Sequence, residues 1–160
     1  MRRASAGAGL VVLGLAVAVA AGCASDKKMI KSGSGDIVAD RQRLMKLHGQ
    51  LWSDIQAKAK ANNIEGIEAP AETLAINAQY IPVLFPEGSL TDKSKAKPEI
   101  WQKFPEFEAA AKKMETEAVK LRDASKAKNA QLTQDIVKDF GRNACGSCHT
   151  PFRVPPPRTS

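Results

Sequence analysis

The sequence predicts an all-α fold, an antiparallel four-helix bundle. From residue 36 onward, four segments carry apolar residues at the spacing of an amphipathic helix, and proline, asparagine, glycine or serine separates each from the next. Runs of β-branched residues, which are typical of strands, are nearly missing from this part of the chain. The fourth segment ends in a Cys-x-x-Cys-His motif at residues 145–149. Amphipathic helices joined by loops bury their apolar stripes against one another, which favours a bundle.

The first helix is predicted over residues 37–62. Asp36 is a suitable N-cap, and the asparagine pair at 62–63 closes the helix. Its apolar stripe consists of Ile37, Leu44, Met45, Leu47, Leu51, Trp52 and Ile55.

The second helix is predicted to begin at Pro70, which fits a first turn, and to stop at Pro82. It carries Leu74, Ile76, Ala78 and Ile81 toward the core. Residues 86–98 then form a long connection without periodicity. This connection is expected to lie over one face or end of the bundle.

The third helix is expected to begin between Pro98 and Pro105 and to run to about Ser125. Because proline fits only the first turn of a helix, a break is predicted near Pro105. The fourth helix is predicted over residues 128–149, with Leu132 among its apolar positions. Pro151 and the later prolines exclude a further helix and leave a short tail.

Residues 1–22 have the form of a secretory signal peptide. Arg2 and Arg3 precede an uncharged run of small and aliphatic residues. A transmembrane anchor is the alternative, but the run is rich in alanine and glycine, which makes it a weaker reading. Export across the inner membrane predicts a protein on the periplasmic side of a bacterial membrane.

Cys23 follows directly. The stretch Ala20-Ala21-Gly22-Cys23 resembles a bacterial lipobox, in which the cysteine becomes diacylated, although leucine usually stands where this chain has Ala20. Two acyl chains would hold the protein at a membrane surface. Simple cleavage nearby is the alternative. Residues 23–35 then form a flexible polar tether, residues 36–153 the folded domain, and residues 154–160 a tail.

The charge of the chain is basic and dispersed. Lysine and arginine total 24 against 17 acidic residues, and removal of residues 1–22 lowers the net charge from +7 to about +5. A basic protein favours an acidic partner or an anionic surface. The lysines alternate with acidic residues along the helices, as on a solvated face, so nucleic acid is not an expected partner.

A Cys-x-x-Cys-His motif is where c-type haem is attached. Residues three and four apart share one helix face, so Cys145, Cys148 and His149 can converge on one flat cofactor. Each cysteine can form a thioether with a haem vinyl group, and the histidine can bind the iron. The motif predicts one haem c per chain, attached near the C-terminus. Bacteria attach c-type haem on the outer side of the inner membrane, which agrees with the export that residues 1–22 predict.

Two other kinds of site use cysteines at this spacing. A structural zinc ion needs four ligands, and the only further candidates are Cys23 and His48. A thioredoxin-like redox centre needs a βαβ surrounding, whereas the flanks here are helical. Both fit the chain less well than haem.

Residues 36–153 resemble the cytochrome c′ family, whose haem motif lies at the C-terminal end of a four-helix bundle. Most other small cytochromes c carry the motif near the N-terminus. Besides the motif, the resemblance rests on Arg41-Gln42 with Met45-Lys46, Leu84-Phe85-Pro86-Glu87-Gly88-Ser89, Lys97-Pro98-Glu99-Ile100-Trp101 and Phe152-Arg153.

The resemblance implies a role for individual residues. Cys145 and Cys148 match the thioether cysteines, and His149 matches the proximal iron ligand. Arg153 matches an arginine beside the proximal histidine. Arg41 matches an arginine near the haem propionates, and Gln42 accompanies it at the haem edge; a solvated helix residue is the alternative for Arg41.

Met45 aligns with the position that faces the vacant side of the iron. In five-coordinate, high-spin members this side chain only blocks that side, whereas in low-spin members a methionine binds the iron as sixth ligand. Packing in the core is a third possibility. We favour iron ligation by Met45. His48 is expected to be a partly exposed residue on a neighbouring helix face rather than a ligand.

The expected function is one-electron transfer with a redox protein partner. The competing function is that of a five-coordinate haem protein that binds nitric oxide or carbon monoxide on the Met45 side. An enzyme such as a haem peroxidase is least favoured, because only His48 could serve there as a polar acid or base. A homodimer through the first helix, which the family often shows, is a further possibility.

Overall fold

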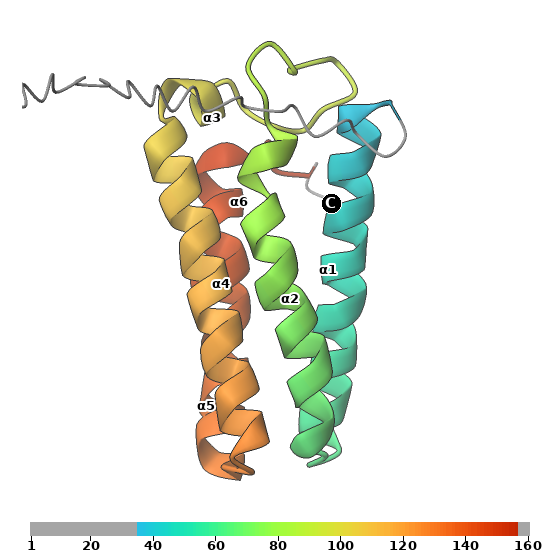
Figure 1. Cartoon of the computed structure of the whole chain (residues 1–160), viewed down its shortest axis with the longest axis vertical. Coiled ribbons are helices and arrows are strands. Elements are labelled where there is room, and N and C mark those ends of the chain that lie inside the picture. Colours follow the sequence, from blue (N-terminus) through green and yellow to red (C-terminus); the bar gives the residue numbers. More distant parts are fainter. Residues whose placement is uncertain (1–34, 157–160) are drawn as a thin grey trace, which may run out of the picture.

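The computed structural model describes residues 35–156 and confirms a four-helix bundle (Figure 1). The predicted signal peptide, Cys23, most of the tether and the last four residues lie outside the described part. Its helices are α1 (Ile37–Lys60), η1 (Glu65–Ile67), α2 (Glu68–Tyr80), η2 (Pro82–Leu84), α3 (Glu99–Gln102), α4 (Phe104–Lys126), α5 (Ala130–Phe140), η3 (Gly141–Cys145) and α6 (Gly146–Phe152). Within the described residues, no helix is both long and apolar enough to span a membrane.

Helix α1 begins and ends close to the predicted limits. The Asp36 carboxylate accepts hydrogen bonds from the amides of Val38 and Ala39, at 3.0 and 3.1 Å. Such a cap satisfies amide groups that have no partner inside the helix. Asn62 has a positive φ of 53°, a conformation that asparagine tolerates well and that ends the helix.

Helix α2 begins before Pro70. The short helix η1 leads directly into it at Glu68, and the Asn63 side chain caps this turn by accepting a hydrogen bond from the Gly66 amide at 3.1 Å. Pro70 therefore occupies the first turn rather than the first position. The first amides of a helix have no carbonyl partner within it, so a proline without an amide hydrogen fits there at no cost in hydrogen bonds.

The predicted break near Pro105 is confirmed. Lys103, with φ −129° and ψ 45°, separates α3 from α4, and Pro105 lies in the first turn of α4. The fourth helix differs more from the prediction. It continues past His149 and Pro151 to Phe152, because Pro151 stands in the last turn, where its missing amide removes a single hydrogen bond.

The fourth helix also contains a π-helical turn. Helix α5 passes into the π-helix η3 at Gly141, and η3 passes into α6 at Gly146. A π-turn inserts an extra residue into the helical ladder and rotates everything that follows, and such turns are frequent at functional sites. Here the turn holds Cys145 at its end, so it sets the direction in which the Cys-x-x-Cys-His motif faces.

The core lies between the four helical columns. Its most deeply buried large side chains are Ile55, Ile67, Leu74, Ile100, Leu121 and Phe140. Alanines of α2 and α4 are buried between them, which lets these two helices approach closely: Ala71, Ala75, Ala78, Ala110, Ala111 and Ala118. Three side chains predicted to face inward are instead exposed, since Leu47, Ile76 and Leu132 retain 40%, 47% and 47% of their accessible surface.

The connection over residues 85–98 and the short helix α3 lie at one end of the bundle (Figure 1). The start of α1 and the whole of α6 lie at the same end. An antiparallel bridge between Ala96 and Arg153 joins the connection to the residue that follows α6, with the Val154 amide donating to the Lys95 carbonyl at 2.8 Å. The connection thus covers the end that carries the Cys-x-x-Cys-His motif.

Candidate haem site

A cavity of about 410 Å³ lies at this end of the bundle, between α1 and the fourth helix. Its wall is mostly apolar, and its volume falls within the roughly 300–1,000 Å³ of sites for small molecules and cofactors. Among the residues that line it are Met45, His48, Gly49, Phe107, Cys145, Cys148, His149 and Arg153. The cavity therefore brings the motif together with one face of α1.

The face that α1 presents to the cavity includes Met45, His48, Gly49 and Trp52. These positions are three or four residues apart, as residues on one helix face are. A Cβ atom built on Gly49 would meet nothing within 4 Å, so the helix surface is open at this point. Glycine inside a helix costs about 1 kcal/mol relative to alanine, and a flat group lying against α1 would account for it.

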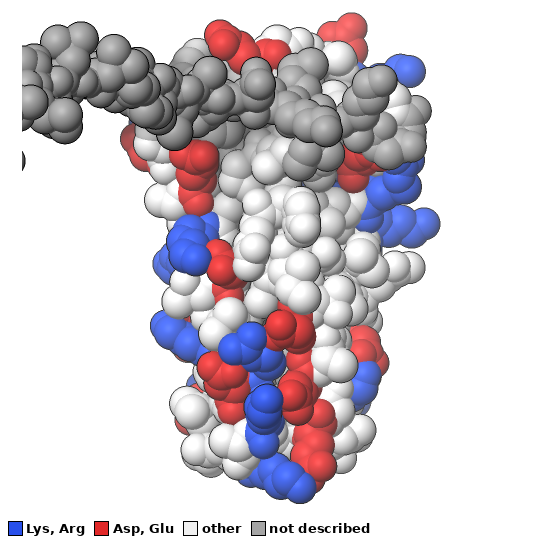
Figure 2. Space-filling view, in the orientation of Figure 1, with Lys and Arg blue, Asp and Glu red and all other residues white. Residues whose placement is uncertain are grey.

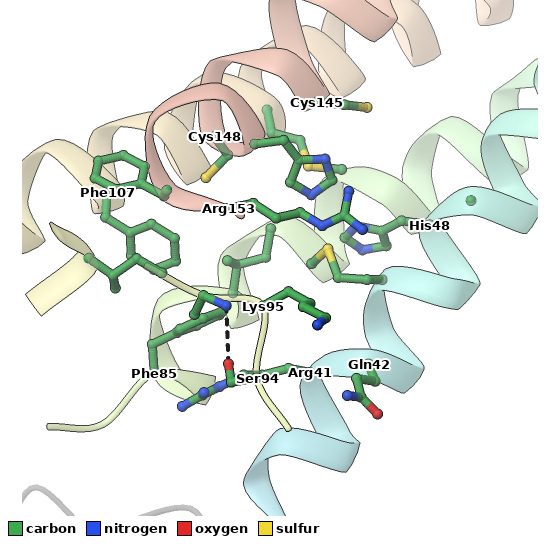
Figure 3. A pocket seen from close by; sticks show the side chains of 18 of the residues that line it. Arg41, Gln42, His48, Phe85, Ser94, Lys95, Phe107, Cys145, Cys148 and Arg153 are labelled. Atoms are coloured by element: carbon green, nitrogen blue, oxygen red, sulfur yellow. Dashed lines mark hydrogen bonds between the residues drawn. The ribbon is translucent and has the colours of Figure 1, made fainter. Parts of the chain in front are cut away.

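The two cysteines enter the cavity from the fourth helix. Cys145 closes η3 and Cys148 lies in α6, and the two side chains leave the helix in different directions (Figure 3). Both are free thiols. Burial raises the pKa of Cys145, and burial together with the neighbouring Cys145 raises the pKa of Cys148 to about 11. Redox-active dithiols have lowered pKa values instead, so the raised pKa values of these two thiols do not favour a thioredoxin-like centre.

His149 lies at the edge of the cavity, beside Arg153. Partial burial lowers the pKa of its imidazole, and the charge of Arg153 lowers it further. The neutral imidazole is the form that binds a metal. No group of three or more His, Cys, Asp or Glu side chains among residues 35–156 is arranged to hold a bare metal ion.

Arg41 has a structural role that the sequence did not indicate. It is only 4% exposed, and its guanidinium donates to the Leu84 carbonyl, to the Ser89 carbonyl at 3.0 Å and to the Ser89 hydroxyl. It also lies over the Phe85 ring, 4.2 Å from the centroid. Trp101 holds the same loop by donating to the Phe85 and Pro86 carbonyls at 3.1 and 2.9 Å. Several stretches that carried the family resemblance thus contact one another.

Replacing Arg41 with alanine is expected to destabilise the protein by about 2 kcal/mol, because two loop residues lose a charged hydrogen-bond donor. Arg41→Lys should recover only part of this loss, since an ammonium cannot reproduce the guanidinium fork. Denaturant titration of the holoprotein measures both. The control is Arg43→Ala, an exposed arginine paired with Asp40, which should cost less than about 1 kcal/mol.

The role of Arg41 near the haem propionates stays a prediction. If Arg41→Ala left the free energy of unfolding unchanged and shifted only the reduction potential, a propionate contact would be favoured over the contact with the loop. Gln42 lines the cavity while its amide donates to the Lys93 carbonyl at 3.2 Å. The exposed residues Lys95 and Arg153 also line the cavity and mark its mouth toward solvent (Figure 3).

His48 is where the structure departs most from the sequence analysis. It is 7% exposed rather than partly exposed, and it points from α1 into the region of the cavity opposite the cysteines (Figure 3). Burial lowers the pKa of its imidazole to about 4, with a smaller contribution from His149. Its Nε2 has no hydrogen-bond partner among the described residues. The helical periodicity of the sequence could have predicted the burial of His48, since His48 shares the helix face of Met45 and Trp52.

These features fit a haem. Two thiols and a neutral imidazole stand on one wall of an apolar cavity, the opposite wall has an open patch at Gly49, and cationic side chains stand at the mouth. A porphyrin has a flat apolar body, an iron that takes axial ligands and two carboxylates that favour a cationic edge. When bound, it supplies a one-electron iron couple.

Comparison with known proteins gives the same assignment. The family model for cytochrome C′ matches residues 36–153. A cytochrome c-556 from Agrobacterium tumefaciens (strain II Chrys) is 32% identical over 120 residues, which are 73% of this chain and 96% of that protein.

Solved structures share the fold. A nitric oxide complex of a variant of cytochrome c prime from Alcaligenes xylosoxidans has a TM-score of 0.67 at 23% identity, covering 76% of this chain and 95% of that chain. A cytochrome c′ with an unusual ligand-controlled dimer dissociation also has a TM-score of 0.67, at 25% identity, covering 74% of this chain and 95% of that one. Because the family model matches residues 36–153 and the cytochrome c-556 is 32% identical, the chain belongs to the cytochrome c′ family and is a haem c protein.

Proposed function

We propose that this protein is a one-electron carrier whose haem is bound through Cys145 and Cys148, with His149 as proximal ligand. The observation that carries the proposal is the cavity that brings these three side chains together opposite Met45. Much of the remaining wall is aromatic or aliphatic, with Trp52, Leu74 and Phe107 among its residues. A dry site limits the reorganisation that accompanies a change of one charge.

Met45 is proposed as the sixth ligand. It lines the cavity from α1, is partly buried, and packs against the core of the bundle. A thioether ligand favours the reduced state and raises the reduction potential, as in other Met/His-ligated cytochromes. This role suits an electron acceptor of comparatively high potential.

Spectra of the purified holoprotein test this proposal. The ferric form should be low-spin with the far-red sulfur-to-iron absorption band, and the ferrous form should bind carbon monoxide slowly. Met45→Ala should abolish the far-red band, because that band requires sulfur on iron. A high-spin ferrous wild type that binds carbon monoxide readily would count against the sixth ligand and for the alternative below.

The alternative function is reversible binding of nitric oxide or carbon monoxide to a five-coordinate haem. It is supported by the apolar wall on the α1 side and by the nitric oxide complex known for cytochrome c prime from Alcaligenes xylosoxidans. In this case Met45 would only narrow the access of gases to the iron.

The redox partner is proposed to be an acidic protein that docks at the mouth of the cavity. Lys95 and Arg153 stand at this opening, and Lys97 lies beside it with its ammonium donating to the Thr150 carbonyl at 3.4 Å. Opposite charges would speed the encounter, so electron transfer should slow as the ionic strength rises. A rate that does not depend on salt would contradict this docking face.

Export and lipid anchoring at Cys23 are proposed from the sequence of residues 1–23. The wild type should therefore fractionate with bacterial membranes and enter the detergent phase. Cys23→Ser should release the cytochrome into the soluble periplasmic fraction with its haem intact. If wild type and variant were both soluble, simple cleavage near Cys23 would be the better account.

A homodimer is proposed through α1 and α2. Figure 2 shows an uncharged face over the middle and upper part of these helices, and charged side chains flank it along α4, at the upper edge of α1 and at the lower end of the bundle. Exposed apolar residues of this region include Leu47, Ile76, Tyr80 and Val83, at 40–53% exposure. Light scattering of the wild type and of Ile76→Lys tests the proposal: a dimer should become a monomer, and a monomeric wild type would contradict it.

A further inference from the structure

His48 is a buried histidine on the wall of the cavity. It is 7% exposed, and its Nε2 makes no hydrogen bond within residues 35–156. Leaving a buried polar atom unpaired costs roughly 1–3 kcal/mol, so native structures seldom retain one without a use. Because His48 lines the same cavity as Cys145, Cys148 and His149, its partner is expected among the atoms that occupy that cavity.

The cavity wall indicates what kind of partner fits. None of the described residues that line it is an aspartate or a glutamate, so no carboxylate is there to receive a proton from the imidazole. The charged groups at the opening, Lys95 and Arg153, are cations, and they disfavour an imidazolium. A neutral imidazole in such a wall offers a nitrogen lone pair. The haem iron that the cavity is proposed to hold is a group that binds such a lone pair, and a neutral imidazole is a common ligand of iron.

The haem would also bring two carboxylates. These have better partners than His48 at the mouth of the cavity, because Lys95 and Arg153 carry full positive charges in a more exposed place. His48 instead projects from the same face of α1 as Met45 and Gly49. Hydrogen bonding to a propionate is therefore the weaker assignment.

We propose that His48 is a second distal ligand, which binds the haem iron whenever Met45 does not. The inference rests on the proposed attachment of haem with His149 on the opposite side. Residues three apart on a helix have Cβ atoms about 5–6 Å apart, so Met45 and His48 could each reach one iron from the same face of α1, but only one of them at a time. Which of the two would bind would then depend on the position of α1.

Spin state in matched variants tests this assignment. The ferric Met45→Ala holoprotein should stay six-coordinate and low-spin, without the sulfur-to-iron band, and the Met45→Ala/His48→Phe double variant should become high-spin. Phenylalanine fills the place of the imidazole without a lone pair. If His48 binds the iron about nine-tenths of the time, carbon monoxide should bind the ferrous single variant about tenfold more slowly than the double variant.

Two results would overturn the proposal: a high-spin Met45→Ala variant that binds carbon monoxide as fast as the double variant, or a double variant that remains low-spin. Met45→Val, alone and with His48→Phe, gives the same comparison with a smaller loss of volume if the alanine variants do not fold. Acid-acetone extraction of every variant separates these outcomes from a failure of haem attachment, which would release the pigment and overturn the proposed function as well.

Discussion

The double variant Cys145→Ala/Cys148→Ala is expected to lose covalent haem completely. The two thiols stand on the wall of one cavity, at the end of η3 and in α6, so each can reach one edge of the same porphyrin. Without the thioethers, the iron is held by axial ligands alone. Acid-acetone extraction of protein matured in a haem-assembling periplasm should release all pigment, and mass analysis should find the bare polypeptide.

Each single variant should keep its haem through one thioether, with the absorption bands shifted because one vinyl group stays unsaturated. Ser147→Ala is the matched control. Ser147 lies between the cysteines, and its hydroxyl donates to the Ala144 carbonyl at 2.7 Å within the helix rather than to the cavity. It should retain haem like the wild type. Pigment that resisted extraction from the double variant would show that these cysteines are not the points of attachment.

The helical architecture could be predicted because its signals are local. Asp36 caps α1, Asn62 ends it, and Pro105 requires a break before α4. Each of these signals depends on the chemistry of one residue. The π-turn at Gly141 could not be predicted in this way, because α-helices and π-helices use the same residues and differ in tertiary packing. Pro151 misled the prediction since its effect depends on its place within the last turn.

Periodicity also assigned too many residues to the core. Leu47, Ile76 and Leu132 have helical spacing but lie at the margin of their stripes, where only the packing of neighbouring helices decides burial. Conversely, Arg41 and His48 are buried because of tertiary contacts. Arg41 donates hydrogen bonds to the loop at Ser89, and His48 lines the cavity. From residue type alone, an arginine is expected to be exposed, whereas a histidine can be either buried or exposed.

In the candidate site, the residues of the haem motif could be predicted from the sequence, but those of the α1 side could not. The motif at 145–149 has a fixed spacing that specifies its chemistry, so a single sequence is enough to identify it. The distal side has no such spacing. Which side chain of α1 faces the iron depends on the rotation of α1 against the fourth helix, and a rotation of one residue would exchange Met45 for a neighbour.

Phe107→Ala is expected to cause the largest loss of stability of any single substitution in the aromatic cluster near the haem site. The ring is 2% exposed and contacts Phe85 and Phe152 edge to face, with centroids 4.8 and 5.4 Å away. Truncating a buried phenylalanine costs about 3–5 kcal/mol, because the cavity left behind closes only in part. Denaturant titration of the holoprotein measures the loss as a lower transition midpoint.

Phe104→Ala is the matched control on the same helix. Phe104 is only partly buried, and its nearest ring is Phe107, at 6.0 Å. Its truncation should cost less than half as much. The difference arises because Phe107 joins α4 to the loop that holds Arg41 and to the end of α6 that follows the haem motif, whereas Phe104 joins none of these. Equal losses in the two variants would contradict this prediction, because the partly exposed ring would then contribute as much stability as the buried one.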